Sequence, residues 1–287
     1  MKQLKYNLYK NSKVNLDQTI NSGQVFLWKK IDKKWFGIDG DRVLILEDFQ
    51  KFEKNLKYEF NFLRLDDEFE IISKDLKNDK IVRRALKLFP GLRLLRQDPF
   101  QCYISFIASS NSNIPNIKSS LQKLCQMFGK RKKVNGEYFF LFPKPSDLAN
   151  ASISDIQKCG LGYRAKAVKN ASLSVVNGKI DFDSLKKIDY NSAKKELIKV
   201  FGIGNKVADC ILLFSLEKHE AFPLDRWMLR ILQKYYSKEF QISTKTITEK
   251  TYNELHERIV EYFGHYAGYA QQFLFKMERE MYKKKWL

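Results

Sequence analysis

The sequence predicts an α+β protein in which a β-rich N-terminal domain with an antiparallel sheet is followed by a helical body. Two observations support this prediction. Near the N-terminus, two apolar runs flank Asp39-Gly40, a dipeptide typical of a tight β-hairpin. From about Asp66 onward, apolar residues recur every three or four positions, which is the period of a helix with one buried face. We expect the β-rich domain to span residues 1–95 and the helical domain residues 96–287.

Three stretches of the N-terminal third are strand-like. GQVFLWKK is mostly apolar, and KKWFGIDGDRVLILE consists of two apolar runs around the Asp39-Gly40 turn. LKYEFNFLRL alternates between polar and apolar residues, so we expect a further strand there. The whole chain of 287 residues is 44% hydrophobic and 14% aromatic. This composition supports a packed core and argues against wholesale disorder.

The helical pattern begins with DEFEIISKDLKNDKIVRRALKLF. Beyond it, turns that contain proline or glycine separate the expected helices, for example at Asp98-Pro99 and at Gly160–Gly162. The lysine-rich run GKRKKVNG interrupts the helical pattern. We interpret this run as a solvated loop rather than a binding site.

The charge of the chain points to a polyanionic partner. Lys and Arg number 52 against 33 Asp and Glu, which gives a net charge of +19 and an isoelectric point near 9.6. Nucleic acid is the favoured partner, and an anionic membrane surface is the alternative. The longest apolar runs, ADCILLFSL and RVLILE, are far shorter than the roughly 20 residues that cross a bilayer, so no membrane partner is expected.

The N-terminus and the cysteines bear on cellular location and on cofactors. The first thirty residues contain no apolar core of a signal peptide, so we expect a cytoplasmic protein, nucleoid-associated in a prokaryote, with the nucleus as the alternative. Cys102, Cys125, Cys159 and Cys210 are scattered without any C-x-x-C pair, which argues against disulfides and against a zinc site. The C-terminal segment has no cysteine, which excludes an iron–sulfur cluster held there by four thiolates. We therefore expect no metal or other cofactor.

The stretch VFGIGNKVADC places Lys206 two residues after a Gly-x-Gly turn. NSAKKELIKVF, before the turn, is expected to form a helix with Ser192 as its N-cap, and KVADCILLFSL, after it, a helix that is apolar nearly all round. Two helices joined by such a turn bind phosphate, because glycine lets the backbone approach and free N–H groups at the helix start point at an anion. The Walker phosphate loop is excluded, since Val207 stands where Ser or Thr would follow the lysine.

Lys206 is expected to be either a phosphate clamp or a nucleophilic amine. A helix N-terminus carries about half a positive charge, which disfavours the ammonium form, and apolar packing acts in the same direction. Asp225 follows 19 residues later, after Pro223 and at the expected N-cap of an amphipathic helix. This separation allows both side chains to reach one cleft. There the amine would attack a carbon atom, and the carboxylate would stabilise positive charge that develops on a sugar.

Taken together, VFGIGNKVADCILLFSL and the following AFPLDRWM resemble the helix–hairpin–helix DNA glycosylase superfamily, and specifically its 8-oxoguanine DNA glycosylase/AP lyase branch. The resemblance continues in order through NSGQVFLWKK, QDPFQCYISFIASSNSNI, CGLGYRAKAV and GHYAGYAQQFLF. It implies two helical subdomains that contain a helix–hairpin–helix motif and grip double-stranded DNA containing oxidised guanine. It also implies base-excision repair, in which Lys206 attacks C1′ and forms a Schiff base, Asp225 assists, and β-elimination nicks the strand. We expect a monomer.

The same resemblance assigns four residues to a pocket for the flipped base. The carbonyl of Gly23 would accept the N7 hydrogen that 8-oxoguanine has and guanine lacks. Cys210 and Phe275 would sandwich the base, and Gln271 would bond to its Watson–Crick edge. Helical spacing is consistent with these roles. Lys206 and Cys210 lie four residues apart, as do Gln271 and Phe275, so each pair shares a helix face.

Six further residues match DNA contacts of the family. Three match residues that reach the cytosine opposite the lesion, namely Asn111, Tyr163 and Arg164. Three would hold a backbone phosphate, namely Gly202, Gly204 and the amide of Val207.

Two positions depart from the family pattern. Asn116, in NSNIPN, stands where animal and fungal members have an arginine, and this puts the selectivity for the opposite base in doubt. Trp227 stands two residues after the aspartate, where those members have a histidine, and this puts a phosphate or pocket contact in doubt. Neither departure affects the lysine chemistry.

Two other functions fit parts of this pattern. The first is a glycosylase for another damaged base, such as an alkylated base or an oxidised pyrimidine. The missing cysteine cluster argues against the endonuclease III and adenine-glycosylase branches, and Lys206 argues against monofunctional alkyl-base enzymes. The second is a non-catalytic DNA-binding module that uses the hairpin only for phosphates. Such a module would bind DNA without a covalent intermediate, and the presence of both Lys206 and Asp225 would then be a coincidence.

Overall fold

The computed structural model describes residues 14–47, 56–242 and 247–284. Residues 1–13, on which part of the signal-peptide expectation rests, lie outside these ranges. The chain forms two compact units, the first from segments 1–24, 53–96 and 218–287 and the second from segments 25–52 and 97–217. The sequence boundary between residues 95 and 96 stays a prediction. In none of the described ranges is a helix long and apolar enough to cross a lipid bilayer.

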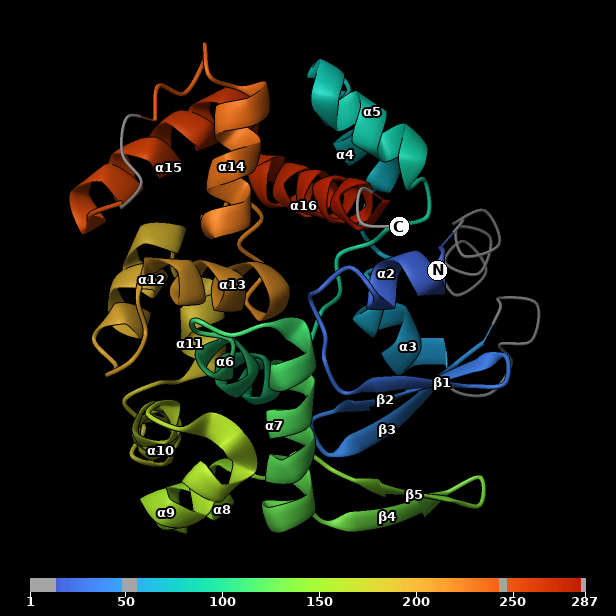
Figure 1. The fold of residues 1–287 in the computed structure, drawn as a ribbon, viewed down its shortest axis with the longest axis vertical. Helices are drawn as coiled ribbons and strands as arrows, with labels where there is room; N and C mark the ends of the chain where they lie inside the picture. Colours follow the sequence, from blue (N-terminus) through green and yellow to red (C-terminus); the bar gives the residue numbers. More distant parts are fainter. Residues whose placement is uncertain (1–13, 48–55, 243–246, 285–287) are drawn as a thin grey trace. The chain divides into compact units, whose positions relative to one another are not determined.

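The first unit is helical (Figure 1). Its elements are α2 (Leu16–Ile20), α3 (Leu56–Phe62), α4 (Phe69–Leu76), α5 (Lys80–Leu88), α14 (Arg226–Tyr235), α15 (Glu249–Phe263), the 3-10 turn η3 (Gly264–Tyr266) and α16 (Ala267–Lys284). α16 packs against α5 and α14. The helical period predicted after Asp66 is confirmed by α4 and α5, and Asp79 caps α5 by accepting from the Val82 N–H at 2.7 Å.

The second unit contains all five strands of the described chain, eight further α-helices and one π-helical turn. Its strands are β1 (Trp28–Ile31), β2 (Lys34–Asp39), β3 (Arg42–Leu46), β4 (Arg131–Val134) and β5 (Glu137–Phe140). Its helices are α6 (Pro99–Ala108), α7 (Ile114–Phe128), α8 (Pro145–Asn150), α9 (Ile153–Ile156), the π-helical turn η2 (Gln157–Leu161), α10 (Arg164–Val176), α11 (Phe182–Lys187), α12 (Tyr190–Ile198) and α13 (Asn205–Ser215). The predicted α+β fold class, an antiparallel sheet followed by a helical body with a helix–hairpin–helix motif, is confirmed.

The antiparallel sheet follows chain order, β1-β2-β3, and β4 pairs with β5 in a separate hairpin. The predicted turn at Asp39-Gly40 is confirmed, since Asp39 pairs with Arg42 and Gly40 has a φ of +59°. A side chain at Gly40 is excluded for a second reason, because its Cβ would lie 2.8 Å from the Asp98 carboxylate. The turn is therefore determined by backbone conformation and by packing.

Three local predictions are wrong. LKYEFNFLRL forms helix α3 rather than a strand, because Glu59, Phe62 and Leu63 are buried at helical spacing. The GKRKKVNG run forms strand β4 and a turn rather than a loop, because β5 pairs with it and is itself packed on the sheet. Ser192 is not the cap of α12, since its N–H donates to Asp189 Oδ1 at 3.0 Å and Asp189 is the N-cap.

Helix α6 is fastened to the three-stranded sheet by polar contacts near its N-terminus. The Asp98 N–H donates to Asp39 Oδ1 at 2.8 Å. Gln101 Nε2 donates to the Ile38 carbonyl at 2.7 Å, and Gln101 Oε1 accepts from the Gly40 N–H at 2.9 Å. These contacts fix α6, and with it the segment that follows its last residue.

A buried ion pair fastens α12 to α13. Lys194 Nζ lies 3.1 Å from Asp209 Oδ1, and the two side chains are 7% and 0% exposed. The hydroxyl of Tyr190 donates to the same carboxylate at 2.6 Å and accepts from Lys194 Nζ at 2.8 Å. Because each charge has a partner of opposite sign or a hydrogen bond, the pair withstands burial and holds the two helices of the motif together.

The Asp209→Asn substitution should destabilise the protein by about 3 kcal/mol or more, because it leaves the buried ammonium of Lys194 facing a neutral amide. The measurement is the free energy of unfolding in urea. Glu196→Gln is the matched control, since Glu196 forms an exposed pair with Lys199, and it should cost less than about 1 kcal/mol. Equal costs for the two variants would show that the buried pair does not hold the helices.

Candidate active site

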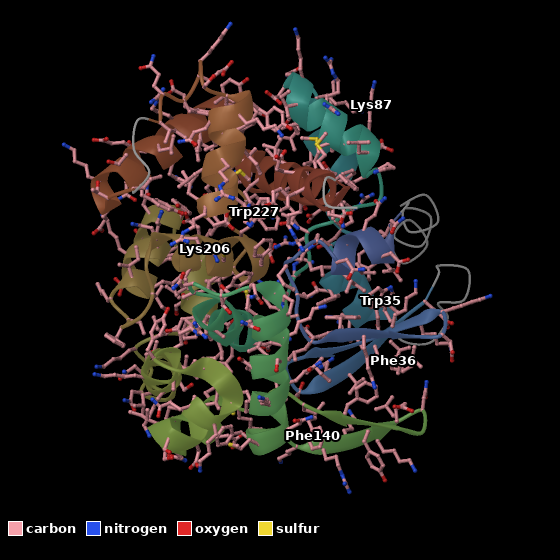
Figure 2. The ribbon with its side chains drawn as sticks, viewed as in Figure 1. Trp35, Phe36, Lys87, Phe140, Lys206 and Trp227 are labelled. Carbon is pink, nitrogen blue, oxygen red and sulfur yellow. The ribbon has the colours of Figure 1, made fainter. Side chains whose placement is uncertain are left out.

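Lys206 is the second residue of α13 and is half-buried (Figure 2). Its Nζ donates to Ser109 Oγ at 3.3 Å and lies 5.5 Å from the centre of the Phe106 ring. Within the described part of the second unit, no carboxylate forms an ion pair with this amine. A hydroxyl can accept from an ammonium and donate to a neutral amine, so Ser109 can accompany Lys206 in both protonation states.

The turn before α13 requires glycine at one of its two glycine positions. Gly202 has a φ of +89°, and a Cβ there would lie 2.3 Å from the Cβ of Ala167 on α10. Gly204, the N-cap, has a φ of −98° and open space around it. Its lack of a side chain leaves the first N–H groups of α13, including that of Val207, without a side-chain acceptor. These groups are directed at whatever anion approaches the helix start.

Three consecutive residues after α6 connect Lys206 to other predicted site residues. Ser109 accepts from Lys206, and the Ser110 carbonyl accepts from Arg164 Nη1 at 3.1 Å. Asn111, the next residue, is exposed and has a φ of +51°. The structure therefore brings Lys206, Arg164 and Asn111 to one segment. Sequence reasoning missed Ser109 and Ser110, because a polar Ser–Asn run carries no signal beyond that of a turn.

Tyr163 and Arg164 project at the start of α10. Tyr163 is 68% exposed, a high value for a large aromatic side chain. The Arg164 guanidinium lies 5.2 Å from the centre of its ring. Gly162 precedes them with φ 54° and ψ −130°, a conformation open in practice only to glycine. Asn116 is also exposed and lies in the first turn of α7, where its N–H donates to Asn113 Oδ1 at 2.9 Å.

In the first unit, α16 carries Gln271 and Phe275 on one face. Gln271 is 5% exposed, and its Oε1 is buried without a hydrogen-bond partner among the described residues. Phe275 is half-buried. A buried amide oxygen without a donor is costly, so this atom is a candidate to accept a hydrogen bond from a ligand.

The turn at Gly23 is attached to the same helix. The carbonyl of Ser22 accepts from Gln272 Nε2 at 3.4 Å and from Arg279 Nη1 at 3.3 Å, and both donors lie on α16. Gly23 follows with a φ of +95°. Sequence reasoning missed Gln272 and Arg279, whose partner is a backbone carbonyl some 250 residues away in the chain.

The Arg279 guanidinium interacts with both Phe275 and Asp225. It lies 5.3 Å from the centre of the Phe275 ring. Burial lowers the pKa of Arg279, and the negative charges of Glu280 and Asp225 oppose that shift. Asp225 is the N-cap of α14, as predicted, and its Oδ1 accepts from the Met228 N–H at 2.8 Å. Gly23, Gln271, Phe275 and Asp225 thus form one connected set in the first unit.

Two further features from the sequence analysis are Trp227, which departs from the family pattern, and the four cysteines. Trp227, on α14, is half-buried (Figure 2). Its ring packs edge to face against Tyr282, with centres 5.0 Å apart. Cys210 is 3% exposed and lies one helical turn after Lys206 on α13. All four cysteines are free and buried. Across the described ranges, no three His, Cys, Asp or Glu side chains gather in a way that would hold a metal ion.

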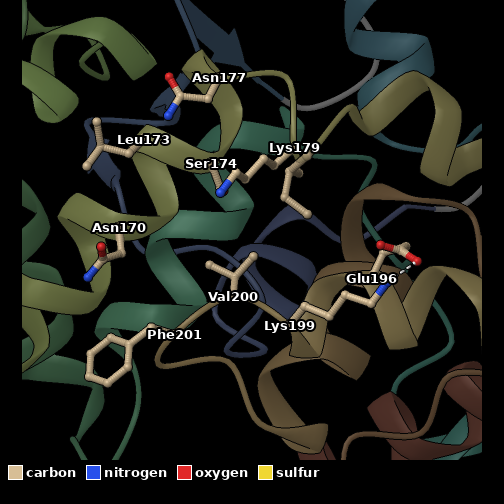
Figure 3. A pocket seen from close by; sticks show the side chains of 10 residues that line it. Asn170, Leu173, Ser174, Asn177, Lys179, Glu196, Lys199, Val200 and Phe201 are labelled. Atoms are coloured by element: carbon tan, nitrogen blue, oxygen red, sulfur yellow. Dashed lines mark hydrogen bonds and ion pairs between the residues drawn. The ribbon is translucent and has the colours of Figure 1, made fainter.

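A cavity of about 600 Å³ opens elsewhere in the second unit (Figure 3). Its lining comes from α10, from the connection at Lys179 and Ile180, and from the end of α12 through Phe201. Lys199 and Glu196 form an ion pair at its edge, with 2.7 Å between Nζ and Oε1. None of the predicted site residues lines this cavity.

Two family models match the chain. Residues 104–258 match the HhH-GPD superfamily base excision DNA repair protein, and residues 7–103 match the 8-oxoguanine DNA glycosylase, N-terminal domain. The first match includes Lys206 and Asp225. The second includes Gly23.

Three similar proteins represent an archaeon, a plant and a bacterium. The probable N-glycosylase/DNA lyase of Methanothermobacter thermautotrophicus is 34% identical over 70% of this chain and 68% of that protein. The N-glycosylase/DNA lyase OGG1 of Arabidopsis thaliana is 33% identical over 73% of this chain, but the match spans only 58% of the plant protein's length. The structure of Clostridium acetobutylicum 8-oxoguanine glycosylase/lyase with double-stranded DNA containing cytosine opposite 8-oxoguanine superposes with a TM-score of 0.83, at 28% identity over 94% of this chain and 93% of that one.

Proposed function

Because this chain belongs to the HhH-GPD superfamily of base excision DNA repair proteins, we propose that it excises 8-oxoguanine from duplex DNA and then nicks the strand, as a bifunctional DNA N-glycosylase and AP lyase. The observation that carries this proposal is Lys206 at the open start of α13, inside a helix–hairpin–helix motif. The similarity to 8-oxoguanine glycosylase/lyases over nearly the whole chain supports it. The protein acts as a monomer in the cytoplasm.

Lys206 is the nucleophile. Its neutral amine attacks C1′ of the damaged nucleotide, a C–N bond forms, and the bond from C1′ to the base breaks. The amine then loses two protons, one to the departing base and one to the ring oxygen O4′, and the break of the C1′–O4′ bond gives a Schiff base. Removal of a C2′ proton then expels the 3′ phosphate oxygen by β-elimination. The Ser109 hydroxyl supports this role, because it can offer the amine a hydrogen bond throughout the sequence.

Asp225 stabilises the positive charge that the sugar acquires as the base departs. A fixed carboxylate is suited to this role, because a preorganised charge needs no reorientation during the reaction. The N-cap hydrogen bond from the Met228 N–H to Oδ1 holds the side chain, and Oδ2 is left to face the sugar.

Four residues recognise the extruded base. The Gly23 carbonyl accepts from N7–H, Cys210 and Phe275 cover the two faces, and Gln271 bonds to the Watson–Crick edge. The buried Oε1 of Gln271 supports this role, since a base amino or imino group would supply the donor that it lacks among the described residues.

The surrounding DNA is held by two further groups. Tyr163 enters the duplex beside Arg164, and Arg164 and Asn111 contact the cytosine opposite the lesion. The exposure of the Tyr163 ring and the link through Ser110 support this arrangement. Gly202, Gly204 and the amide of Val207 bind a backbone phosphate, and the uncapped start of α13 supports that role.

In the Lys206→Gln variant, borohydride should no longer trap a covalent adduct with duplex DNA containing 8-oxoguanine, because glutamine cannot form a Schiff base. The measurement is denaturing electrophoresis of the trapped complex, together with the affinity for damaged duplex, which should remain near that of the parent. Lys199→Gln is the matched control, since Lys199 precedes the same hairpin and is exposed. An undiminished adduct in the Lys206 variant would assign the nucleophile to another residue.

In the Asp225→Asn variant, single-turnover excision should slow by roughly 10²- to 10³-fold, which is typical of losing one preorganised electrostatic contact. The melting temperature should change little, because asparagine caps helices as well as aspartate does. Asp189→Asn changes the cap of α12 in the same way and should leave the rate unaltered. A parallel loss of rate and stability would mean that Asp225 acts only as a cap.

Selectivity for cytosine opposite the lesion should be partial, because Asn116 stands where family members have a second arginine. A good base contact discriminates by about 1–3 kcal/mol, so the absence of one should permit measurable excision opposite adenine, guanine or thymine. The measurement is single-turnover excision opposite each of the four bases, for the parent and for Asn116→Arg. An arginine variant no more selective than the parent would contradict this assignment.

A further inference from the structure

The hairpin of β4 and β5 carries a row of cations that the proposed site does not use. Lys130, Arg131, Lys132 and Lys133 are consecutive and exposed, and no described carboxylate forms an ion pair with any of them. The one acidic residue of the hairpin, Glu137, lies 3.5 Å from Lys29 of β1. The hairpin therefore presents a local excess of positive charge.

The hairpin is held in place by packing and by its turn. Phe139 of β5 stacks on Phe36 of β2, with ring centres 5.6 Å apart and planes at 16°. Asn135 and Gly136 form the turn with positive φ angles of 51° and 84°, the combination found in tight hairpins. A Cβ at Gly129, just before β4, would lie 1.9 Å from the Leu141 carbonyl oxygen, which keeps the two strands close where they leave the unit. The cations thus lie on a hairpin whose backbone is held in place.

The outer face of the hairpin, opposite the Phe36 contact, consists of Arg131, Lys133, Tyr138 and Phe140, because their register places them on one side of the two strands. Figure 2 labels Phe140 and Phe36. Tyr138 is 54% exposed. The Arg131 guanidinium lies 4.6 Å and Lys133 Nζ lies 5.5 Å from the centre of its ring. The ring restrains both cations by cation–π attraction, so less side-chain entropy is lost when they meet an anion. Alternate residues of a strand stand about 6.6 Å apart on one face, so the two charges meet the same stretch of a polyanion.

Helix α7 separates the β4–β5 hairpin from the segment at Asn111. It begins at Ile114, three residues after Asn111, and ends at Phe128, just before the hairpin (Figure 1). Its 15 residues span about 22 Å at 1.5 Å per residue. The hairpin therefore begins about one helix length from the segment at Asn111, so it is a surface distinct from that segment.

We propose that the outer face of the β4–β5 hairpin binds the phosphodiester backbone of duplex DNA, at a place separate from the Lys206 site. The tip of the hairpin is Asn135-Gly136, which offers no apolar side chain for insertion into a lipid surface, and we therefore commit to DNA, the polyanion that the family binds, as the ligand. The inference rests on DNA being the ligand of the protein. It does not rest on excision.

The test compares two variants that each lose four positive charges. The hairpin variant combines Lys130→Gln, Arg131→Gln, Lys132→Gln and Lys133→Gln. The control variant combines Lys77→Gln, Arg83→Gln, Arg84→Gln and Lys87→Gln, which removes exposed cations on and beside α5. Binding to an undamaged duplex of about 30 base pairs is measured as a function of salt, so that the result is independent of catalysis.

The hairpin variant should lower the slope of log Kd against log salt by about 1.8, because Arg131 and Lys133 of the outer face each neutralise one phosphate and each neutralised phosphate contributes about 0.9. The control variant should leave the slope near that of the parent. Tyr138→Leu should weaken binding about two- to fivefold by releasing the two cations, while Tyr138→Phe keeps the ring and should match the parent. An unchanged melting temperature would establish that the hairpin variant is folded.

Three outcomes would overturn the proposal. Equal losses of slope in the hairpin and control variants would mean that only net charge matters. A loss seen with single-stranded oligonucleotide but not with duplex would assign the hairpin to another nucleic acid. Loss of binding to phosphatidylserine–phosphatidylcholine vesicles with an unaltered duplex slope would assign it to a membrane surface.

Discussion

The close packing of Gly202 against Ala167 is the constraint on which the candidate nucleophile depends. Because a Cβ at Gly202 would lie 2.3 Å from that of Ala167, the turn can approach α10 only with glycine there, and this approach sets where α13 begins. The Lys194–Asp209 pair and Tyr190 then hold α12 and α13 together. Lys206 therefore starts its helix from a rigid motif, which suits its proposed role as a nucleophile that must meet one carbon atom.

The surroundings of Lys206 depend on contacts remote in sequence. Helix α6 is fixed to the sheet through Asp39 and Gln101, and its end delivers Ser109 to the amine. In the first unit, α16 has the corresponding role, because Arg279 bonds to the Ser22 carbonyl beside Gly23 and lies over the ring of Phe275. In each unit, one helix orients groups of the candidate site without carrying the candidate nucleophile. In the second unit α6 positions Ser109, and in the first unit α16 positions the turn at Gly23 and the ring of Phe275.

In the second unit, the candidate reactive amine and the row of exposed cations lie on different elements, the start of α13 and the β4–β5 hairpin. The start of α13 combines a half-buried amine with backbone N–H groups, an arrangement suited to one phosphate and one reacting carbon. The β4–β5 hairpin places exposed cations around an aromatic ring, an arrangement suited to a polymer with repeated charges. Much of the net charge of +19 can thus increase affinity without entering the reaction.

Local signals in the sequence determined the fold class, the Asp39-Gly40 turn, the glycine hairpin before Lys206 and the cap at Asp225, because each depends on neighbouring residues. The roles of Gly23, Cys210, Gln271 and Phe275 came from family resemblance and remain proposals. Only the tertiary structure decided that LKYEFNFLRL is helical, that the lysine-rich run is a strand, and that Ser109 meets Lys206. The physical reason is that these outcomes depend on which surface is buried and on which distant side chain supplies the partner, and neither is encoded in a short window of sequence.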